Sequence, residues 1–262
     1  GLKRRRKEPK GSFFEEERRI MAGLLSNLLQ GKGGTKGNCS VVVAAAGSST
    51  RMEGADKILL PLGKAPVLVH TLTALSACPR VNEIIVVTRE DLLTTVSQLC
   101  RDFGLEKVRK VILGGKSRTE SVYFGVREVD PEAKFIAVHD GARPFVTPEL
   151  VETVLDAAIE KGAAAPAVPV KDTIKRAVNG IVTETPNRAE LFAVQTPQIF
   201  DGDLLRGALQ KAQEDKASIT DDCSAVERLG ATVCLVPGDD CNIKITTPAD
   251  LLLADGILQG RA

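Results

Sequence analysis

Short apolar runs alternate with longer amphipathic segments from residue 40 onward. Four runs have the length and continuous apolar character of strands buried on both faces, at 40–46, 83–88, 108–113 and 134–139. Helical spacing lies between and after them, near 67–76, 92–103, 117–129 and 148–161. This alternation predicts an α/β fold with a mostly parallel, Rossmann-like sheet, helices on both faces and right-handed crossovers.

The pattern changes after a further apolar run at 163–168. Residues 172–178 and 181–185 alternate around Asn179-Gly180, a dipeptide typical of a type I′ turn. The sequence therefore predicts a protruding β-hairpin arm at about 170–188. Because an isolated hairpin is marginal in water, we expect the arm to pack on something else. A second subunit, giving a homodimer through the arm, is one interpretation; a hairpin folded back on its own domain is the other.

Charge divides the chain at about residue 40. Residues 1–40 contain 10 basic and 4 acidic residues, leaving 25 basic and 30 acidic residues in 41–262. Charge runs followed by the Gly-rich stretch 31–37 predict a disordered basic leader and linker over 1–39. The basic run could also touch an acidic surface or RNA. Residues 40–262 are predicted to form one domain, arm included.

Composition excludes several classes of protein. Aromatic residues make up 3% of the chain, with no Trp and one Tyr, which disfavours a nucleic-acid partner that stacks its bases. No window approaches the ~20 apolar residues that span a bilayer, so no membrane partner is expected. The six cysteines form no C-x-x-C pair, as in reduced cytoplasmic proteins, and we assign no metal to them.

The loop after the first predicted strand has the composition of a phosphate-binding loop. Residues 44–50 carry little side-chain bulk, so a base and its phosphates can approach backbone N–H groups. Arg51 then offers a rigid fork of donors, and Lys57 a mobile charge. This pattern predicts a nucleoside triphosphate site; an ordinary buried strand with surface cations is the alternative. Two further polar loops, 114–118 and 140–143, follow predicted strands and should meet it in one crevice.

Seven short motifs occur in order along residues 40–258. They are Ala44-Ala45-Ala46-Gly47-x3-Arg51-Met52 with Lys57, Gly114-Gly115-x2-Arg118-x2-Ser121-Val122, His139-Asp140-Gly141-Ala142-Arg143-Pro144, Asp172-Thr173-x-Lys175-Arg176, Gln195-Thr196-Pro197-Gln198, Thr220-Asp221-Asp222 and Asn242-Ile243-Lys244. Together they resemble the 2-C-methyl-D-erythritol 4-phosphate cytidylyltransferase family. A glycine, Gly141, stands where that pattern usually has an alanine.

The resemblance implies a nucleotidyl transfer from CTP to methylerythritol phosphate, with pyrophosphate as leaving group and Mg²⁺ carried mainly by the CTP phosphates. It implies catalytic roles for Arg51 and Lys57. It also implies that the nucleotide is bound by Ala45, Ala46, Gly47, Gly114, Gly115 and Ser121, and that the sugar phosphate is positioned by Arg188, Lys244, Thr173 and Asp140.

Other interpretations stay open. A relative acting on ribitol phosphate or another polyol phosphate would share the nucleotide half, and a non-catalytic nucleotide-binding protein would share the fold. Asp140 could serve as a turn cap, and Arg143 as a structural or a substrate-side cation. We expect His139 and His70 to be structural. Asp221-Asp222 suits a helix N-terminus, although the resemblance also places a Thr-Asp pair here, after Thr220, near the substrate.

Overall fold

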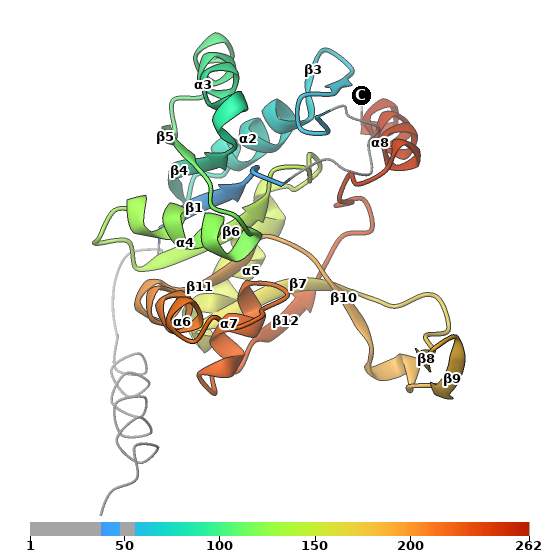
Figure 1. Ribbon diagram of the computed structural model, residues 1–262. Helices are drawn as coiled ribbons and strands as arrows, with labels where there is room; N and C mark the ends of the chain where they lie inside the picture. The colour runs from blue at the N-terminus through green and yellow to red at the C-terminus, as the bar shows by residue number, and fades with distance from the viewer. Residues whose placement is uncertain (1–37, 48–55, 262) are drawn as a thin grey trace, which may run out of the picture. The chain divides into compact units, whose positions relative to one another are not determined.

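The computed structural model describes residues 38–47 and 56–261. The strands of its main sheet are β1 (Cys39–Ala44), β4 (Val81–Thr88), β5 (Val108–Leu113), β6 (Phe135–Asp140), β7 (Ala163–Pro169), β10 (Phe192–Val194), β11 (Gln198–Asp201) and β12 (Cys234–Pro237). They follow the order β10-β7-β11-β6-β1-β4-β5, and β12 pairs with β7 (Figure 1). Two small hairpins are β2 (Pro61–Leu62) with β3 (Ala65–Pro66), and β8 (Arg176–Val178) with β9 (Ile181–Glu184).

Helices connect most of these strands. The α-helices are α2 (Val67–Ala77), α3 (Leu93–Asp102), α4 (Arg118–Glu128), α5 (Pro148–Lys161), α6 (Gly202–Glu214), α7 (Asp222–Arg228) and α8 (Pro248–Arg261). Short 3₁₀ turns are η1 (Glu90–Leu92) and η2 (Arg188–Glu190). Helix α5 shows how local sequence sets the bounds: Thr147 caps its first turn at Leu150 N, and Gly162 ends it at a φ of 86°.

The predicted parallel sheet is confirmed for the strands that surround β1. Strands β4 and β6 flank β1 in parallel, and β5 extends the sheet beyond β4. The sequence pattern did not predict β11, which runs antiparallel between β6 and β7. Its four residues are too few to show a period of their own. The first strand begins at Cys39, within the range predicted for the leader, and the rest of that leader lies outside the described residues.

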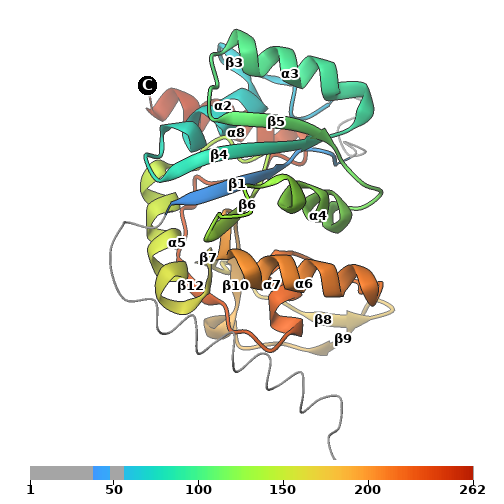
Figure 2. The same ribbon diagram turned by 90° about the vertical axis from the view of Figure 1, so that its left-hand side faces the viewer.

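Helices cover both faces of the sheet, as predicted. Side chains alternate along a strand, so Val41 and Val43 of β1 belong to one core cluster and Val42 to the other. The first cluster joins the sheet to α2, α3 and α5, and the second joins it to α4, α6 and α7. Figure 2 shows α5 on the opposite side of the strands from α4 and α6. No helix of the described residues is long and apolar enough to cross a membrane.

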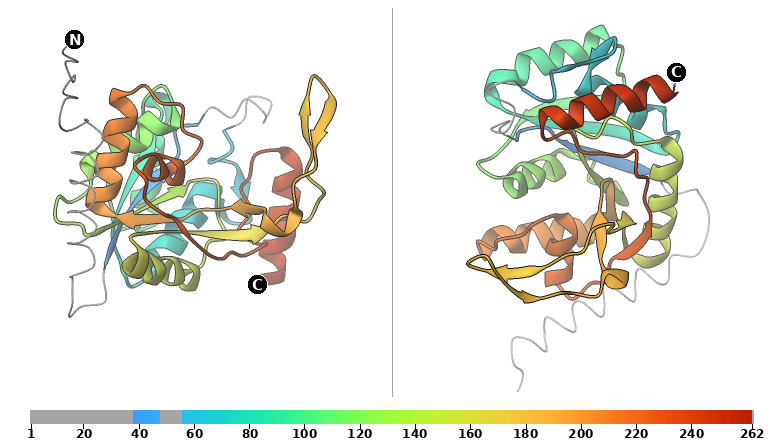
Figure 3. Two further views of the ribbon diagram at one scale, coloured as in Figure 1. Left: turned by 90° about the horizontal axis from the view of Figure 1, so that it is seen from below. Right: turned by 90° about the vertical axis from the view of Figure 1, so that its right-hand side faces the viewer.

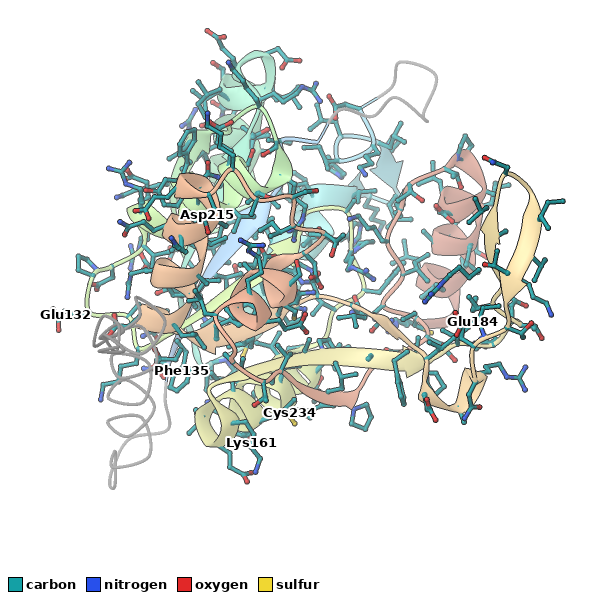
Figure 4. All side chains as sticks on the ribbon, turned by 60° about the horizontal axis from the view of Figure 1, so that its bottom comes forward. Glu132, Phe135, Lys161, Glu184, Asp215 and Cys234 are labelled. Atoms are coloured by element: carbon teal, nitrogen blue, oxygen red, sulfur yellow. The ribbon has the colours of Figure 1, made fainter. Side chains whose placement is uncertain are left out.

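The predicted arm is present and extends away from the sheet (Figure 3). Asn179 and Gly180 have φ values of 50° and 79°, as a type I′ turn requires. Every residue of β8 and β9 is exposed, and Figure 4 shows Glu184 on the arm, away from the part of the chain that carries Phe135. Within the described part of this chain, the hairpin does not fold back onto its own core.

Candidate active site

A cavity of about 490 Å³ opens where β1, β4, β5 and β6 end. The parallel register explains the meeting of these strand ends, because Ala44 pairs with Val87 on one side and with Asp140 on the other. Strand order also reverses at β1, the position where open α/β sheets bind ligands. The lining residues are Ala44, Ala45, Ala46, Gly47, Lys57, Ile58, Thr88, Arg89, Glu90, Leu113, Gly114, Gly115, Lys116, Ser117, Arg118, Ser121, Asp140, Ala142 and Lys244.

Most residues singled out from the sequence meet in this cavity. They are Ala45, Ala46, Gly47, Lys57, Gly114, Gly115, Ser121, Asp140 and Lys244. Arg51 lies outside the described residues. Thr173 and Arg188 do not join the lining of the same chain; both are exposed beside the arm, where Arg188 Nη1 donates to Lys171 O at 2.9 Å. The structure therefore groups the predicted nucleotide residues and separates two of the predicted substrate residues from them.

Two walls of the cavity approach each other closely. A Cβ on Gly114 would lie 2.6 Å from Ala46 Cβ and 2.8 Å from Ser121 Oγ. Ser121 also maintains the fold of the glycine loop, since its hydroxyl accepts from Gly115 N at 3.0 Å and donates to Ser117 O at 2.8 Å. Because its hydroxyl makes both of these hydrogen bonds, Ser121 stabilises the conformation of the glycine loop.

Asp140 is the centre of the charged part of the cavity. Lys244 Nζ lies 3.0 Å from Asp140 Oδ2, Arg143 Nε lies 3.3 Å from the same oxygen, and Arg118 Nε lies 3.5 Å from Oδ1. Burial opposes the carboxylate, but these three cations outweigh burial and hold the pKa of Asp140 well below its usual range. Asp140 therefore stays ionised, and its carboxylate pairs with cations rather than capping a turn.

Arg118 joins the cavity to a fully buried carboxylate. Its Nη2 donates to Asp222 Oδ2 at 2.8 Å, and Asp222 has a relative exposure of 0%. Burial opposes the charged guanidinium, but the charges of Asp222 and Asp140 outweigh it and raise the pKa of Arg118. Burial also raises the pKa of Asp222, which Arg118 counteracts. The pair holds a cation at the start of α4, facing the cavity.

The helix that carries Asp222 is fixed by Gln198. The Gln198 side-chain oxygen accepts from the backbone N–H groups of Asp222 and Cys223 at 3.1 and 3.0 Å. Asp221 caps the same helix through Ser224, which confirms the helix N-terminus expected for the Asp221-Asp222 pair. Gln198 on β11 and Asp222 on α7 thus together position one cation of the cavity, Arg118.

A buried polar network places Lys244. Gln195 and Thr196 bind the Asn242 side chain, whose Nδ2 donates to Thr196 O at 2.9 Å. Arg143 Nη1 donates to Asn242 O at 2.7 Å, so Arg143 is a structural cation. Ile245 N donates to Ala142 O at 2.9 Å and anchors the residue after Lys244. These bonds explain why an asparagine stands two residues before the cavity lysine.

His139 and His70 are structural, as expected. His139 is fully buried, and burial lowers its pKa to about 4. The Thr196 hydroxyl accepts from Asp140 N at 3.0 Å and lies 3.1 Å from His139 Nδ1, while His139 Nε2 lies 3.3 Å from Arg143 O. A carbonyl only accepts, so the proton belongs on Nε2, and Nδ1 accepts from the hydroxyl. His70 Nε2 contacts Leu62 O at 2.7 Å.

Sequence reasoning gave no role to three cations of this cavity: Arg89, Lys116 and Arg118. Arg118 belongs to a quoted motif and stands at a predicted helix start, which was a usable signal. Arg89 follows a predicted strand with no motif around it. Among the described lining residues, five cations face two carboxylates, Glu90 and Asp140, so the cavity suits a polyanion.

Known proteins are similar to this chain in both sequence and fold. A family model described as IspD: 2-C-methyl-D-erythritol 4-phosphate cytidylyltransferase matches residues 39–260. A relative of that name from Halalkalibacterium halodurans is 41% identical over 220 residues, covering 84% of this chain and 96% of its own. Another from Bacillus cytotoxicus is 44% identical over 220 residues, covering 84% and 97%.

Solved structures agree with this assignment. The 4-diphosphocytidyl-2C-methyl-D-erythritol synthase of Anaerococcus prevotii superposes with a TM-score of 0.76 at 30% identity, covering 86% of this chain and 97% of that one. The 2-C-methyl-D-erythritol 4-phosphate cytidylyltransferase of Thermus thermophilus gives a TM-score of 0.71 at 33% identity, covering 84% and 98%. The chain therefore belongs to the 2-C-methyl-D-erythritol 4-phosphate cytidylyltransferase family.

Proposed function

We propose that the chain joins CTP and 2-C-methyl-D-erythritol 4-phosphate to give 4-diphosphocytidyl-2-C-methyl-D-erythritol and pyrophosphate, a step of isoprenoid precursor synthesis. The observation that carries the proposal is a single cavity lined both by small residues and by a cluster of cations. The small residues Ala45, Ala46, Gly47, Gly114 and Gly115 form one side, the small-residue wall. The small residues admit a base to the backbone, and the cations compensate phosphate charge.

The reaction needs positioning more than acid–base chemistry. An oxygen of the sugar phosphate attacks the α-phosphorus of CTP, the bond from that phosphorus to the β,γ-phosphates breaks, and pyrophosphate leaves with the electron pair. A phosphate monoester is already anionic near neutral pH, so no side chain has to remove a proton. The buried, neutral His139 fits this account, because it holds Asp140 through Thr196 and takes no part in the transfer.

The nucleotide occupies the side of the cavity formed by Ala45, Ala46, Gly47, Gly114 and Gly115. Lys57, with Arg51 from outside the described residues, stabilises the charge that builds on the transferring phosphoryl group. Lys244 lies across the cavity beside Asp140, where an ammonium can receive the second phosphate. Asp140 in turn limits the net positive charge and orients Lys244.

A second copy of the chain completes the substrate side. Thr173 and Arg188 lie outside the cavity of their own chain. The arm beside them exposes apolar side chains, whose contact with water is unfavourable: Val178, Ile181 and Val182 have relative exposures of 59%, 71% and 55%. A homodimer formed through the arm would cover these side chains and bring both polar residues to the partner's cavity.

Mg²⁺ is the metal that this chemistry uses, and it neutralises phosphate charge when bound. Among the described residues, no group of three His, Cys, Asp or Glu could hold a metal ion. Among the described lining residues, Asp140 is the one well-buried carboxylate, and Mg²⁺ commonly takes one carboxylate together with substrate phosphates. The donor set therefore fits an ion held mainly by CTP, with Asp140 as the protein's contribution.

The six cysteines are free thiols, and burial raises the pKa of Cys39 to about 12, so that thiol is unreactive. Free thiols of this kind support a reducing cytoplasmic location.

Pyrophosphate release tests the function directly. Purified protein is given CTP and Mg²⁺ with either methylerythritol phosphate or ribitol phosphate, and each reaction is repeated with a chelator. We expect turnover with methylerythritol phosphate only, and loss of turnover with the chelator. Faster turnover with ribitol phosphate would assign the chain to that polyol instead. Binding of CTP without turnover of either acceptor would make it a non-catalytic nucleotide-binding protein.

A further inference from the structure

One arginine joins the two ends of the segment that carries Arg51. Arg89 directly follows β4, and its Nη1 donates to Gly47 O at 3.3 Å. Its Nη2 donates to Asp56 Oδ2 in an ion pair. Gly47 and Asp56 are the last and first described residues on either side of 48–55. A single guanidinium therefore contacts both Gly47 and Asp56 beside the cavity that Gly47 lines.

The other contacts of Arg89 make it a cross-link rather than a phosphate ligand. Its Nε and Nη2 donate to the two carboxylate oxygens of Asp91 at 3.1 and 2.9 Å. A guanidinium has five N–H groups, and these contacts together with those to Gly47 and Asp56 occupy four of them. Side-chain hydrogen bonds to Asp91 and Asp56 raise the pKa of Arg89, so it stays charged. Little of its donor capacity is left for a triphosphate.

The backbone on either side is already fixed to the core, and Arg89 joins these two fixed parts. Ala45 N donates to Val87 O at 2.8 Å before the segment, and Leu68 N donates to Ile58 O at 2.9 Å after it. Asp56 directly precedes Lys57, whose side chain lines the cavity. Holding the Asp56 carboxylate therefore fixes the backbone from which Lys57 extends.

We propose that Arg89 is a positioning residue of the nucleotide site, which bridges Gly47 and Asp56 and so holds the small-residue wall and Lys57 at the spacing that CTP requires. The predicted effect of Arg89 on the turnover of CTP rests on the proposed function. Its predicted effect on hydrogen exchange around Gly47 and Asp56 does not. A site whose contacting groups are already held at the required spacing loses less free energy when a ligand binds. The bridge between Gly47 and Asp56 thus lowers the cost of binding CTP.

The test compares three variants of this chain. Arg89→Gln removes the bridge, Asp56→Asn removes its charged anchor next to Lys57, and Asp102→Asn is the matched control, because Asp102 is an exposed carboxylate on α3 that binds Gln98. The kinetic parameters kcat and KM are measured for CTP and for methylerythritol phosphate separately. Hydrogen exchange of peptides covering 44–60 is followed in the protein without ligands.

We expect Arg89→Gln and Asp56→Asn each to raise KM for CTP by about tenfold, the size of one coupled contact, with KM for the sugar phosphate within about twofold. Exchange in 44–60 should accelerate in both variants and not in Asp102→Asn. The double variant should be no worse than either single variant, because both remove the same bridge.

Wild-type KM for CTP together with unchanged exchange in Arg89→Gln would overturn the proposal. An equal rise of both KM values with a lower Tm would also overturn it, since that is the result of general destabilisation. A wild-type protein that fails to turn over CTP would instead contradict the proposed function, and the exchange measurement would still decide whether Arg89 joins the two ends.

Discussion

Arg118 Nη2 and Asp222 Oδ2 lie 2.8 Å apart, and this contact joins a cation of the cavity to a carboxylate that has no exposure to solvent. The second carboxylate oxygen, Asp222 Oδ1, is buried without a hydrogen-bond partner within the described structure. A protein tolerates such a buried group only when its charge is compensated, and Arg118 supplies the compensation. The charged cavity therefore depends on a residue that cannot itself touch a substrate.

Replacing Asp222 tests that dependence. Asp222→Asn keeps the shape of the side chain but removes the charge that fixes Arg118. We expect kcat/KM to fall by about tenfold and the free energy of unfolding to fall by about 1–3 kcal/mol, because Arg118 is partly exposed and can regain water. Denaturant titration and steady-state kinetics measure the two effects. Asp221→Asn is the matched control, since asparagine also caps helices; an equal loss there would contradict a specific role for Asp222.

Lys57 is predicted to act on the transition state. Lys57→Ala should lower kcat by at least ~100-fold, the effect of one preorganised donor, while the fold is retained. Pre-steady-state and steady-state pyrophosphate release, with circular dichroism for the fold, provide the measurement. Lys64→Ala, an exposed lysine in the turn between β2 and β3, should leave kcat unchanged. Near-normal turnover of Lys57→Ala would remove this lysine from the mechanism.

Gly114 is predicted to be intolerant of a methyl group. Its Cβ would meet Ala46 and Ser121 well inside contact distance, so Gly114→Ala must push apart the two walls of the nucleotide cavity. We expect a loss of about 1–3 kcal/mol of stability from overpacking and a raised KM for CTP. Gly207→Ala in α6 is the control, because a Cβ there meets nothing within 4 Å. Unchanged CTP affinity in Gly114→Ala would show that the nucleotide binds elsewhere.

Stability should depend on pH through His139. Its pKa is 6.5 when unperturbed and about 4 in the folded chain, so between these values the unfolded state binds more protons. The free energy of unfolding should therefore decrease as pH falls from about 6.5 towards about 4, by up to roughly 3 kcal/mol from this residue. Urea titrations of the wild type and His139→Gln across this range isolate the contribution. Parallel curves for the two proteins would refute it.

Sharing of sites between chains can be tested by mixing inactive variants. Lys57→Ala damages the nucleotide side and Arg188→Ala the arm side, so a mixed dimer would contain one undamaged site and one doubly damaged site. Random exchange of subunits should then restore about a quarter of wild-type activity. Mass spectrometry of the intact mixture establishes the exchange. No recovery in exchanged material would place both residues in sites of a single chain.

The sequence predicted the parts of the fold that carry their own signal. Continuous apolar runs identified the strands around β1, and Asn179-Gly180 identified the arm. Because parallel strands present their carboxyl ends together, the convergence of the loops at Gly47, Gly114 and Asp140 also followed from the pattern.

The parts that sequence could not predict are pairings across the chain. Arg118 and Asp222 are 104 residues apart, and Arg89 and Asp56 are 33 residues apart. No local spacing distinguishes such an arginine from a surface one. Strand β11 was missed for a related reason, since its place between β6 and β7 is set by the partners it hydrogen-bonds rather than by its four residues.

Strand β10, which follows the arm and η2, leads directly into the charged part of the cavity. Strand β10 ends at Val194, and the next two residues, Gln195 and Thr196, already hold Asn242 and the backbone of Asp140. A displacement of β10 is thus transmitted within two residues to the charged centre of the cavity. A partner that moves the arm and β10 together would also move Asp140.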